Sequence, residues 1–133
     1  MTSQDQYHDA SGVSALNSQT INTDTTTPGN TVDLLGFKAC TFYVQSGTLT
    51  DGAYTTKLQE SDDDSAWTDV AAANQMGSPT FAAANDNVVK RIGYAGKKRY
   101  CRLAIVSAST SSGGVFSAVA VKGAPEHMPV ADD

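Results

Sequence analysis

The chain has 133 residues, enough for one domain that buries roughly two-thirds of the surface of its unfolded form. Hydrophobic residues make up 40% of the sequence and charged residues 17%, a composition that excludes a strongly disordered or fibrous protein. The formal net charge of −5 argues against nucleic acid as the main partner, because duplex binding depends on cations that neutralise phosphates.

Residues 1–29 are rich in Ser, Thr, Asn and Asp, and they end in a Pro-Gly turn signal. We interpret them as an extended arm, either frayed or ordered against a partner. Leu16 and Ile21 are nearly its only apolar anchors, and residues 19–23 fit a short strand. The arm lacks the basic and apolar regions of a signal peptide, so we expect synthesis and folding in a cytosol. No apolar run is long enough for a transmembrane helix.

From residue 30 onward, short β-type segments are separated by turn residues. The segments that we predict as strands are 31–35, 38–45, 54–60, 66–70, 88–94, 98–107 and 115–122. A spacing of about 10 residues indicates an all-β fold, a single antiparallel β-sandwich that is jelly-roll-like or barrel-like. We therefore divide the chain into the N-terminal arm (1–29), the β-sandwich domain (30–122) and an extended C-terminal tail (123–133).

The clearest local signal is a β-hairpin around an acidic turn. An alternating run over 54–60 leads into the sequence SDDDS at 61–65, and a second extended run follows over 66–70. Two such runs around a short polar turn are typical of a hairpin. The connection over 71–87 is the one long irregular segment, in which 81–84 fits a helical turn.

Alternation along the strands assigns the inward-facing side chains, because successive residues of a strand point to opposite faces. The predicted core consists of Leu34, Phe42, Val44, Tyr54, Leu58, Trp67, Ile92, Leu103, Ile105, Val119 and Val121. Cys40 and Cys101 share strand faces with apolar neighbours, so we interpret them as buried hydrophobes. A disulfide between them would need adjacent strands and stays an open alternative.

The sequence offers little support for catalysis. The two histidines, His8 and His127, lie near the ends of the chain in polar surroundings, whereas a Ser–His–Asp arrangement needs a positioned imidazole. The acidic turn lacks the spacing of a calcium loop. We therefore predict no catalytic residues, no cofactor and no metal. Trp67 is interpreted as a core plug, with stacking on a sugar ring as the alternative.

Charge is divided between two regions of the sequence. Carboxylates concentrate on the predicted hairpin, and basic residues concentrate over 90–102. One interpretation is two solvated strand faces that pair across one sheet. The other is an acidic and a basic surface that meet between neighbouring subunits.

Several segments together carry a resemblance to a known family. They are TVDL at 31–34, SGTLTDGAY at 46–54, KLQESDD at 57–63, WTDV at 67–70, VKRIGY at 89–94, GKKRY at 96–100 and AVAVKG at 118–123, with Pro125 after it. This pattern resembles a family of small virion proteins of tailed bacteriophages, over residues 30–130 and much of the arm. The resemblance implies a structural component of the particle, for which we expect the role of a capsid decoration (cement) protein. It assigns no catalytic residues.

Under this hypothesis the partner is the major capsid protein on the exterior of the virion, with self-association as a dimer or trimer as a further option. We expect no nucleic acid and no membrane as partners. The candidate partner-binding residues are Leu16, Ile21, Lys90, Arg91, Lys97, Lys98 and Arg102. Two alternatives remain, a structural protein of the tail or baseplate and a carbohydrate-binding module displayed on the virion.

Overall fold

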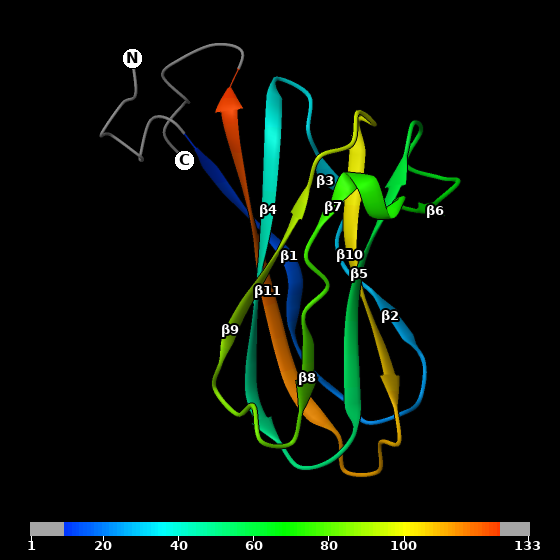
Figure 1. Ribbon diagram of the computed structural model, residues 1–133, viewed down its shortest axis with the longest axis vertical. Coiled ribbons are helices and arrows are strands. Elements are labelled where there is room, and N and C mark those ends of the chain that lie inside the picture. The colour runs from blue at the N-terminus through cyan, green and yellow to red at the C-terminus, as the bar shows by residue number, and fades with distance from the viewer. Residues whose placement is uncertain (1–9, 126–133) are drawn as a thin grey trace.

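The computed structural model describes residues 10–125, which form two antiparallel β-sheets packed face to face (Figure 1). The strands are β1 (Ser11–Ile21), β2 (Thr26–Pro28), β3 (Val32–Asp33), β4 (Phe37–Leu49), β5 (Ala53–Ser61), β6 (Thr68–Asp69), β7 (Gln75–Met76), β8 (Thr80–Ala82), β9 (Val89–Tyr94), β10 (Tyr100–Ala108) and β11 (Gly114–Pro125), and η1 (Ala72–Asn74) is a short 3₁₀ helix. The predicted all-β sandwich is confirmed, and the two sheets with separate edges decide for a sandwich over a closed barrel.

The two sheets differ in their strand order. The five-stranded sheet has the order β1-β11-β4-β9-β7, and the six-stranded sheet has the order β2-β10-β5-β6, with β3 paired to β10 and β8 paired to β5. In β5 the buried Tyr54, Thr56 and Leu58 alternate with more exposed residues, as expected for a strand with one face on the core.

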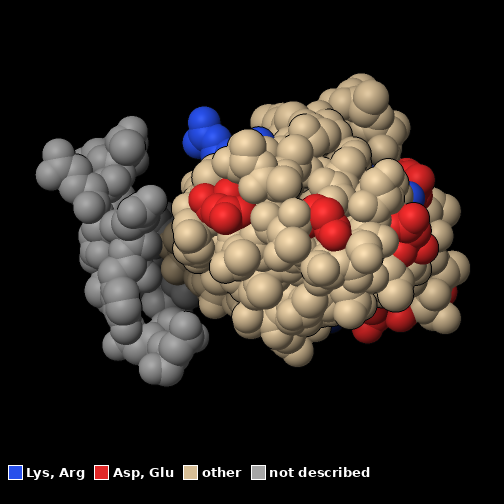
Figure 2. All heavy atoms as spheres, turned by 90° about the horizontal axis from the view of Figure 1, so that it is seen from below, with Lys and Arg blue, Asp and Glu red and all other residues tan. Residues whose placement is uncertain are grey.

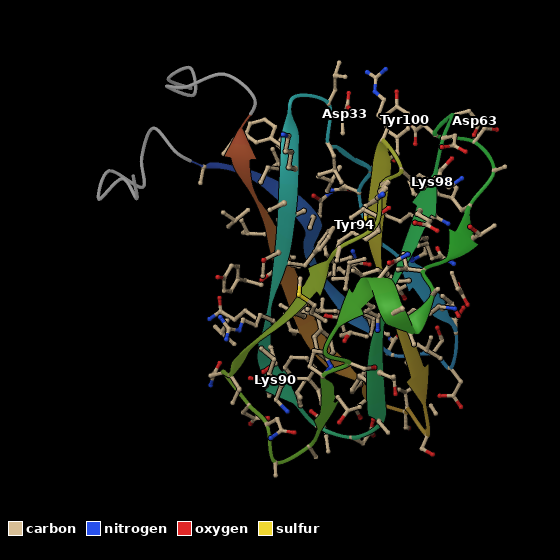
Figure 3. The ribbon with its side chains drawn as sticks, turned by 45° about the horizontal axis from the view of Figure 1, so that its top comes forward. Asp33, Asp63, Lys90, Tyr94, Lys98 and Tyr100 are labelled. Carbon is tan, nitrogen blue, oxygen red and sulfur yellow. The ribbon has the colours of Figure 1, made fainter. Side chains whose placement is uncertain are left out.

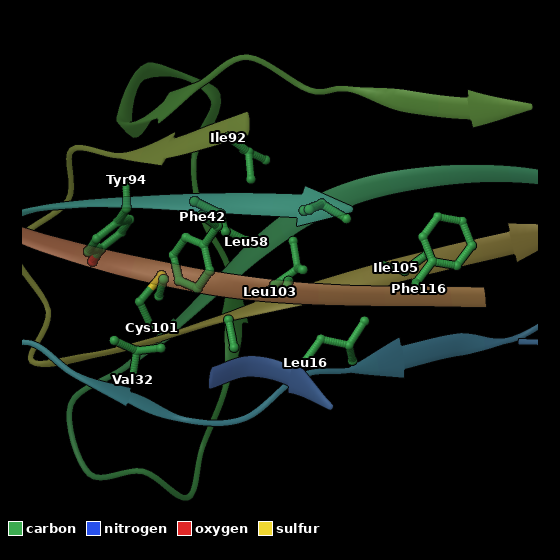
Figure 4. Close-up of a cluster of buried hydrophobic side chains, with 14 of the residues drawn as sticks. Leu16, Val32, Phe42, Leu58, Ile92, Tyr94, Cys101, Leu103, Ile105 and Phe116 are labelled. Carbon is green, nitrogen blue, oxygen red and sulfur yellow. The ribbon is translucent and has the colours of Figure 1, made fainter. Parts of the chain in front are cut away.

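The hydrophobic core fills the space between the two sheets (Figure 4). Seven of the predicted core residues are buried, namely Phe42, Val44, Tyr54, Leu58, Ile92, Leu103 and Ile105. Three aromatic rings pack at one end of the core, with ring centroids 4.7 Å apart for Tyr54 and Phe116 and 5.3 Å apart for Phe81 and Phe116. The predicted burial of Cys40 and Cys101 is confirmed, and both thiols are free.

The predicted core-facing side of the last strand was wrong, because it was placed one residue out of phase. Val119 is exposed and Val121 is only half-buried, whereas Phe116, Ala118 and Ala120 face the core. Both faces of β11 are apolar, so alternation alone could not tell the inner face from the outer one.

Two other predicted core residues lie at the margin of the core. Leu34 is partly buried and packs against the edge of the core. Trp67 is half-buried outside the core, because its ring lies under the guanidinium of Arg102 on the outer face of the six-stranded sheet. The core-plug interpretation of Trp67 is therefore wrong.

Most of the predicted N-terminal arm belongs to the sandwich instead. Strand β1 pairs with β11 from Ser11 opposite Lys122 to Ile21 opposite Gly114. Leu16 and Ile21, two of the candidate partner-binding residues, are buried in the core of this chain. The first nine residues of the arm and residues 126–133 of the predicted tail lie outside the described residues, and so do both histidines.

The segment over 71–87 is more regular than expected. It contains η1, β7 and β8, and Phe81 of β8 is buried opposite Tyr54. The predicted helical turn over 81–84 is therefore wrong. The acidic hairpin is confirmed, because β5 pairs with β6 through Gln59 opposite Asp69 and Glu60 opposite Thr68.

Candidate protein-binding surfaces

Large apolar side chains are exposed together on the outer face of the five-stranded sheet, which we call the apolar sheet face. Tyr43 of β4, Met76 of β7, Val89 of β9 and Val119 of β11 each expose between 38% and 58% of their surface. They come from four of the five strands of one sheet, so the strand pairing places them on one continuous surface.

The register of the sheet arranges these side chains in cross-strand rows. Val119 lies opposite Tyr43, and Tyr43 lies opposite Arg91. In a second row, Met76 lies opposite Gly93. Because Gly93 has no side chain, the Met76 side chain occupies the space that a Cβ at this position would fill. Side chains directly opposite each other in antiparallel strands lie within contact distance. The apolar sheet face therefore joins the adjacent pair Val119 and Tyr43 to Val89 and Met76, and the polar side chains of Arg91, Thr41 and Gln45 lie between them.

A second surface lies at the end of the sandwich where the β3–β4 and β9–β10 loops meet, at the top of Figure 1. These loops enclose a hollow of about 350 Å³, which we call the cationic hollow. It is lined by Leu34, Leu35, Gly36, Phe37, Lys38, Ala39, Cys40, Tyr94, Gly96, Lys97, Lys98 and Arg99. In Figure 3, Asp33, Lys98 and Tyr100 lie at this same end.

The cationic hollow concentrates positive charge. Four of the nine lysines and arginines of the chain line it, and none of its lining residues is acidic. Lys98 Nζ lies 2.6 Å from Asp62 Oδ2. Arg99 donates two hydrogen bonds to the Asp33 carboxylate, at 3.0 and 2.9 Å. Among the described residues, Lys38 and Lys97 form no ion pair.

Hydrogen bonds and burial shift the pKa values of groups in or beside the hollow. The hydrogen bonds from Arg99 hold the pKa of Asp33 below its ordinary value, and the hydrogen bond to Asp62 raises the pKa of Lys98. Burial raises the pKa of Tyr94, and its hydrogen bond to Glu60 acts in the same direction. Tyr94 therefore stays protonated at neutral pH and donates to Glu60 at 2.7 Å.

The opposite end of the sandwich has a different character. Figure 2 shows that end with separate acidic side chains on its surface. Its carboxylates accept hydrogen bonds from backbone N–H groups, Asp24 from Thr110 at 2.8 Å and Asp86 from Leu49 at 2.9 Å. Asp51 accepts three such bonds. These carboxylates organise loops.

The structure distributes the predicted partner-binding residues over several surfaces. Lys97 and Lys98 line the cationic hollow, and Arg91 lies on the apolar sheet face. Lys90 donates to the Thr80 carbonyl at 2.6 Å and covers the Phe81 ring, and Arg102 stacks on Trp67. The prediction thus named parts of two surfaces but missed Lys38, Leu35 and the exposed valines.

The ion pairs bear on the two interpretations of the divided charge. The Lys98–Asp62 pair joins the basic segment to the hairpin turn, and Arg102 Nε donates to Gln59 Oε1 at 2.9 Å across β10 and β5. For these residues the pairing occurs within one chain, as the first interpretation predicts.

Two structural features are absent from residues 10–125. No group of three or more His, Cys, Asp or Glu side chains within that range is placed to hold a metal ion. No helix in it is long and apolar enough to cross a membrane.

Comparison with known proteins gives a likeness at the level of the fold. No family model and no curated protein matches the sequence. The structure is similar to that of PBSX exported protein XepA, with a TM-score of 0.60 and 18% sequence identity over 99% of this chain and 42% of that one. Two further matches have a TM-score of 0.49, SPBc2 prophage-derived protein YomS (14% identity, 86% of this chain and 92% of that one) and a protein of infectious bursal disease virus Gx strain (13% identity, 90% and 34%). The chain spans less than half the length of XepA, and that likeness shows the shared β-sandwich fold.

Proposed function

We propose that this protein is a non-enzymatic structural component of a tailed-phage particle, a decoration protein that binds the major capsid protein on the outside of the head. The apolar sheet face carries this proposal. Exposed apolar patches of a few hundred Å² are often functional surfaces, which supports a protein-binding role for this one. The resemblance of the sequence to small virion proteins and the fold shared with a PBSX protein support the same class of function.

The size of the apolar sheet face fits attachment to a repeating lattice. Four strands about 4.8 Å apart, over at most about five residues each, give a face of roughly 300 Å². A stable one-to-one complex buries about 800 Å² on each partner, so this face alone gives a weak contact. A weak contact is sufficient where many sites are presented together and a second contact raises the effective concentration.

The proposal is tested with phage of the type that encodes the chain, separated into heads and tails. The purified protein should cosediment with heads saturably and leave tails unbound. Val119→Lys, which places a charge in the apolar sheet face, should weaken binding to heads at least about tenfold, because the charge must be desolvated on docking.

Thr55→Lys is the matched control, because Thr55 is an exposed strand residue of β5 in the other sheet. This variant should bind heads like the parent protein. Binding to tails alone would replace the proposal by the tail or baseplate role. Equal binding by both variants would remove the apolar sheet face from the interaction.

A further inference from the structure

We infer that the cationic hollow binds an acidic peptide segment of a partner protein, with carboxylates between Lys38 and Lys97 and an apolar side chain against Leu35. This inference goes beyond the proposed function and does not depend on it, since the hollow lies at one end of the sandwich and the apolar sheet face lies on its side.

The strand geometry directs Lys38 to the mouth of the hollow. Lys38 lies on the same face of β4 as the buried Cys40 and Phe42, but it is itself exposed because the core ends there. Lys97 is exposed in the β9–β10 loop on the other side. The two ammonium groups therefore approach one hollow from two elements, and neither is neutralised by a carboxylate of residues 10–125.

The wall that carries these lysines is held in place by hydrogen bonds between its two loops. Leu34 N–H donates to the Arg99 carbonyl at 2.8 Å, and Arg99 donates in turn to Asp33. Lys98 N–H donates to the Tyr94 hydroxyl at 3.1 Å. A site that is already ordered loses less entropy when it binds a ligand.

Apolar surface beside the charges favours a peptide over a simple anion. Leu35 is 68% exposed at the rim, and the hollow is also lined by Leu34 and Phe37. A segment that alternates acidic and apolar side chains would satisfy both parts of the site, because carboxylates pair with the ammonium groups while the apolar side chain leaves water.

The charges around the hollow argue against nucleic acid. A nucleic acid carries a phosphate at every nucleotide, and its binding needs a continuous track of cations. Next to Lys98 the hairpin turn presents Asp62, Asp63 and Asp64. Glu60 lines a second depression, which shares Lys97 and Lys98 with the cationic hollow. These carboxylates would repel a phosphate chain that continues past the cationic hollow.

The test uses a fluorescein-labelled octapeptide of alternating aspartate and leucine, with fluorescence anisotropy as the readout. The whole protein should bind this peptide saturably below about 1 mM, and added salt should weaken binding. The same peptide with asparagine in place of aspartate should bind at least about tenfold more weakly. Lys38→Ala/Lys97→Ala should cause a similar loss for the aspartate peptide.

Lys57→Ala/Arg91→Ala is the matched control, because it removes the same net charge from strand faces away from the hollow. This control should bind the aspartate peptide like the parent protein. Equal losses in both double variants, equal affinity for the two peptides, or no binding up to about 1 mM would each overturn the inference. Tighter binding of a single-stranded oligonucleotide than of the aspartate peptide would overturn it in favour of nucleic acid. Val119→Lys should leave peptide binding unchanged, so failure here is distinguishable from failure of the head-binding proposal.

Discussion

At the scale of single residues, several carboxylates of this protein hold loops in place. Asp51 accepts hydrogen bonds from the N–H groups of Ser111, Ser112 and Gly113 at 2.9–3.0 Å, and Asp63 accepts bonds from Ser65 and Ala66 within its own turn. These backbone hydrogen bonds lower the pKa of both aspartates below the ordinary value. Each carboxylate thus replaces partners that loop N–H groups would otherwise find in water.

The lowered pKa values predict how stability depends on pH. A carboxyl group with a lowered folded-state pKa contributes stability above its ordinary pKa of about 4, and this contribution is lost as the pH falls through the folded-state value. The urea concentration at which half of the parent protein is unfolded should therefore decrease as the pH is lowered below about 4. Asp51→Asn should lower the midpoint at about pH 7, and its difference from the parent should shrink in acid.

Asp64→Asn is the control for this measurement. Asp64 has a positive φ of 58°, which asparagine tolerates, and its side chain accepts a hydrogen bond from the Thr31 hydroxyl rather than from a loop N–H group. This variant should keep nearly the parent midpoint at about pH 7. A pH-independent difference between parent and Asp51→Asn would contradict the role given to Asp51.

The two cysteines give a second prediction at this scale. Burial raises the pKa of Cys40 to about 12 and also raises the pKa of Cys101. Since the thiolate is the reactive form, both should react with Ellman's reagent at about pH 8 at least a hundredfold more slowly in the native protein than in concentrated guanidinium. Rapid reaction of the native protein would contradict their burial.

At the scale of elements, strand β11 has one face in the core and one face in the proposed binding surface. Phe116 packs against Tyr54 and Phe81, whereas Val119 three residues later is exposed. Phe116→Ala should lower the free energy of unfolding by about 3–5 kcal/mol, because it leaves a cavity in the core. Val119→Ala should cost less than about 1 kcal/mol, as expected at the surface. Urea denaturation of the two variants checks this register, and a larger loss for Val119→Ala would refute it.

Sequence patterns predicted the long strands better than the short ones. Alternation located β4, β5, β9 and β10 to within about four residues, because each is long enough for its core-facing side chains to show a period of two. Strands β7 and β8 have two and three residues, too few to show a period. They form because β9 and β5 offer them an edge to pair with.

The N-terminal strand shows a different limit of the sequence. The sequence of β1 resembles that of a polar arm, because the strand lies at the edge of its sheet and buries few apolar side chains. Register shifts at Ala15 and after Leu16 interrupt its alternation and allow both of these neighbouring residues to be buried. A bulge that depends on the partner strand leaves no simple period in the sequence.

The proposed binding surfaces were predictable only in part. Lys97 and Lys98 stand out in the sequence as a basic pair, and the structure places them in the cationic hollow. Lys38 comes from a distant part of the chain and joins them only through the fold. The apolar sheet face was missed for another reason, because exposed valines such as Val119 carry the same sequence signal as buried ones.

At the scale of the whole molecule, the sandwich separates its surfaces by chemistry. One end carries the cationic hollow, the other end carries carboxylates that organise loops, and the side of the five-stranded sheet is apolar. Contacts through two such surfaces suit a protein that bridges neighbouring subunits of a shell, since two weak contacts made together bind more tightly than either one alone.

Electron cryomicroscopy of heads saturated with the purified protein tests the central claim most directly. The proposal predicts regularly placed density on the outside of the shell, with the five-stranded sheet turned toward the capsid and Val119 within the contact. Density on tails instead of heads, or a sandwich on the shell whose five-stranded sheet points to solvent, would contradict it.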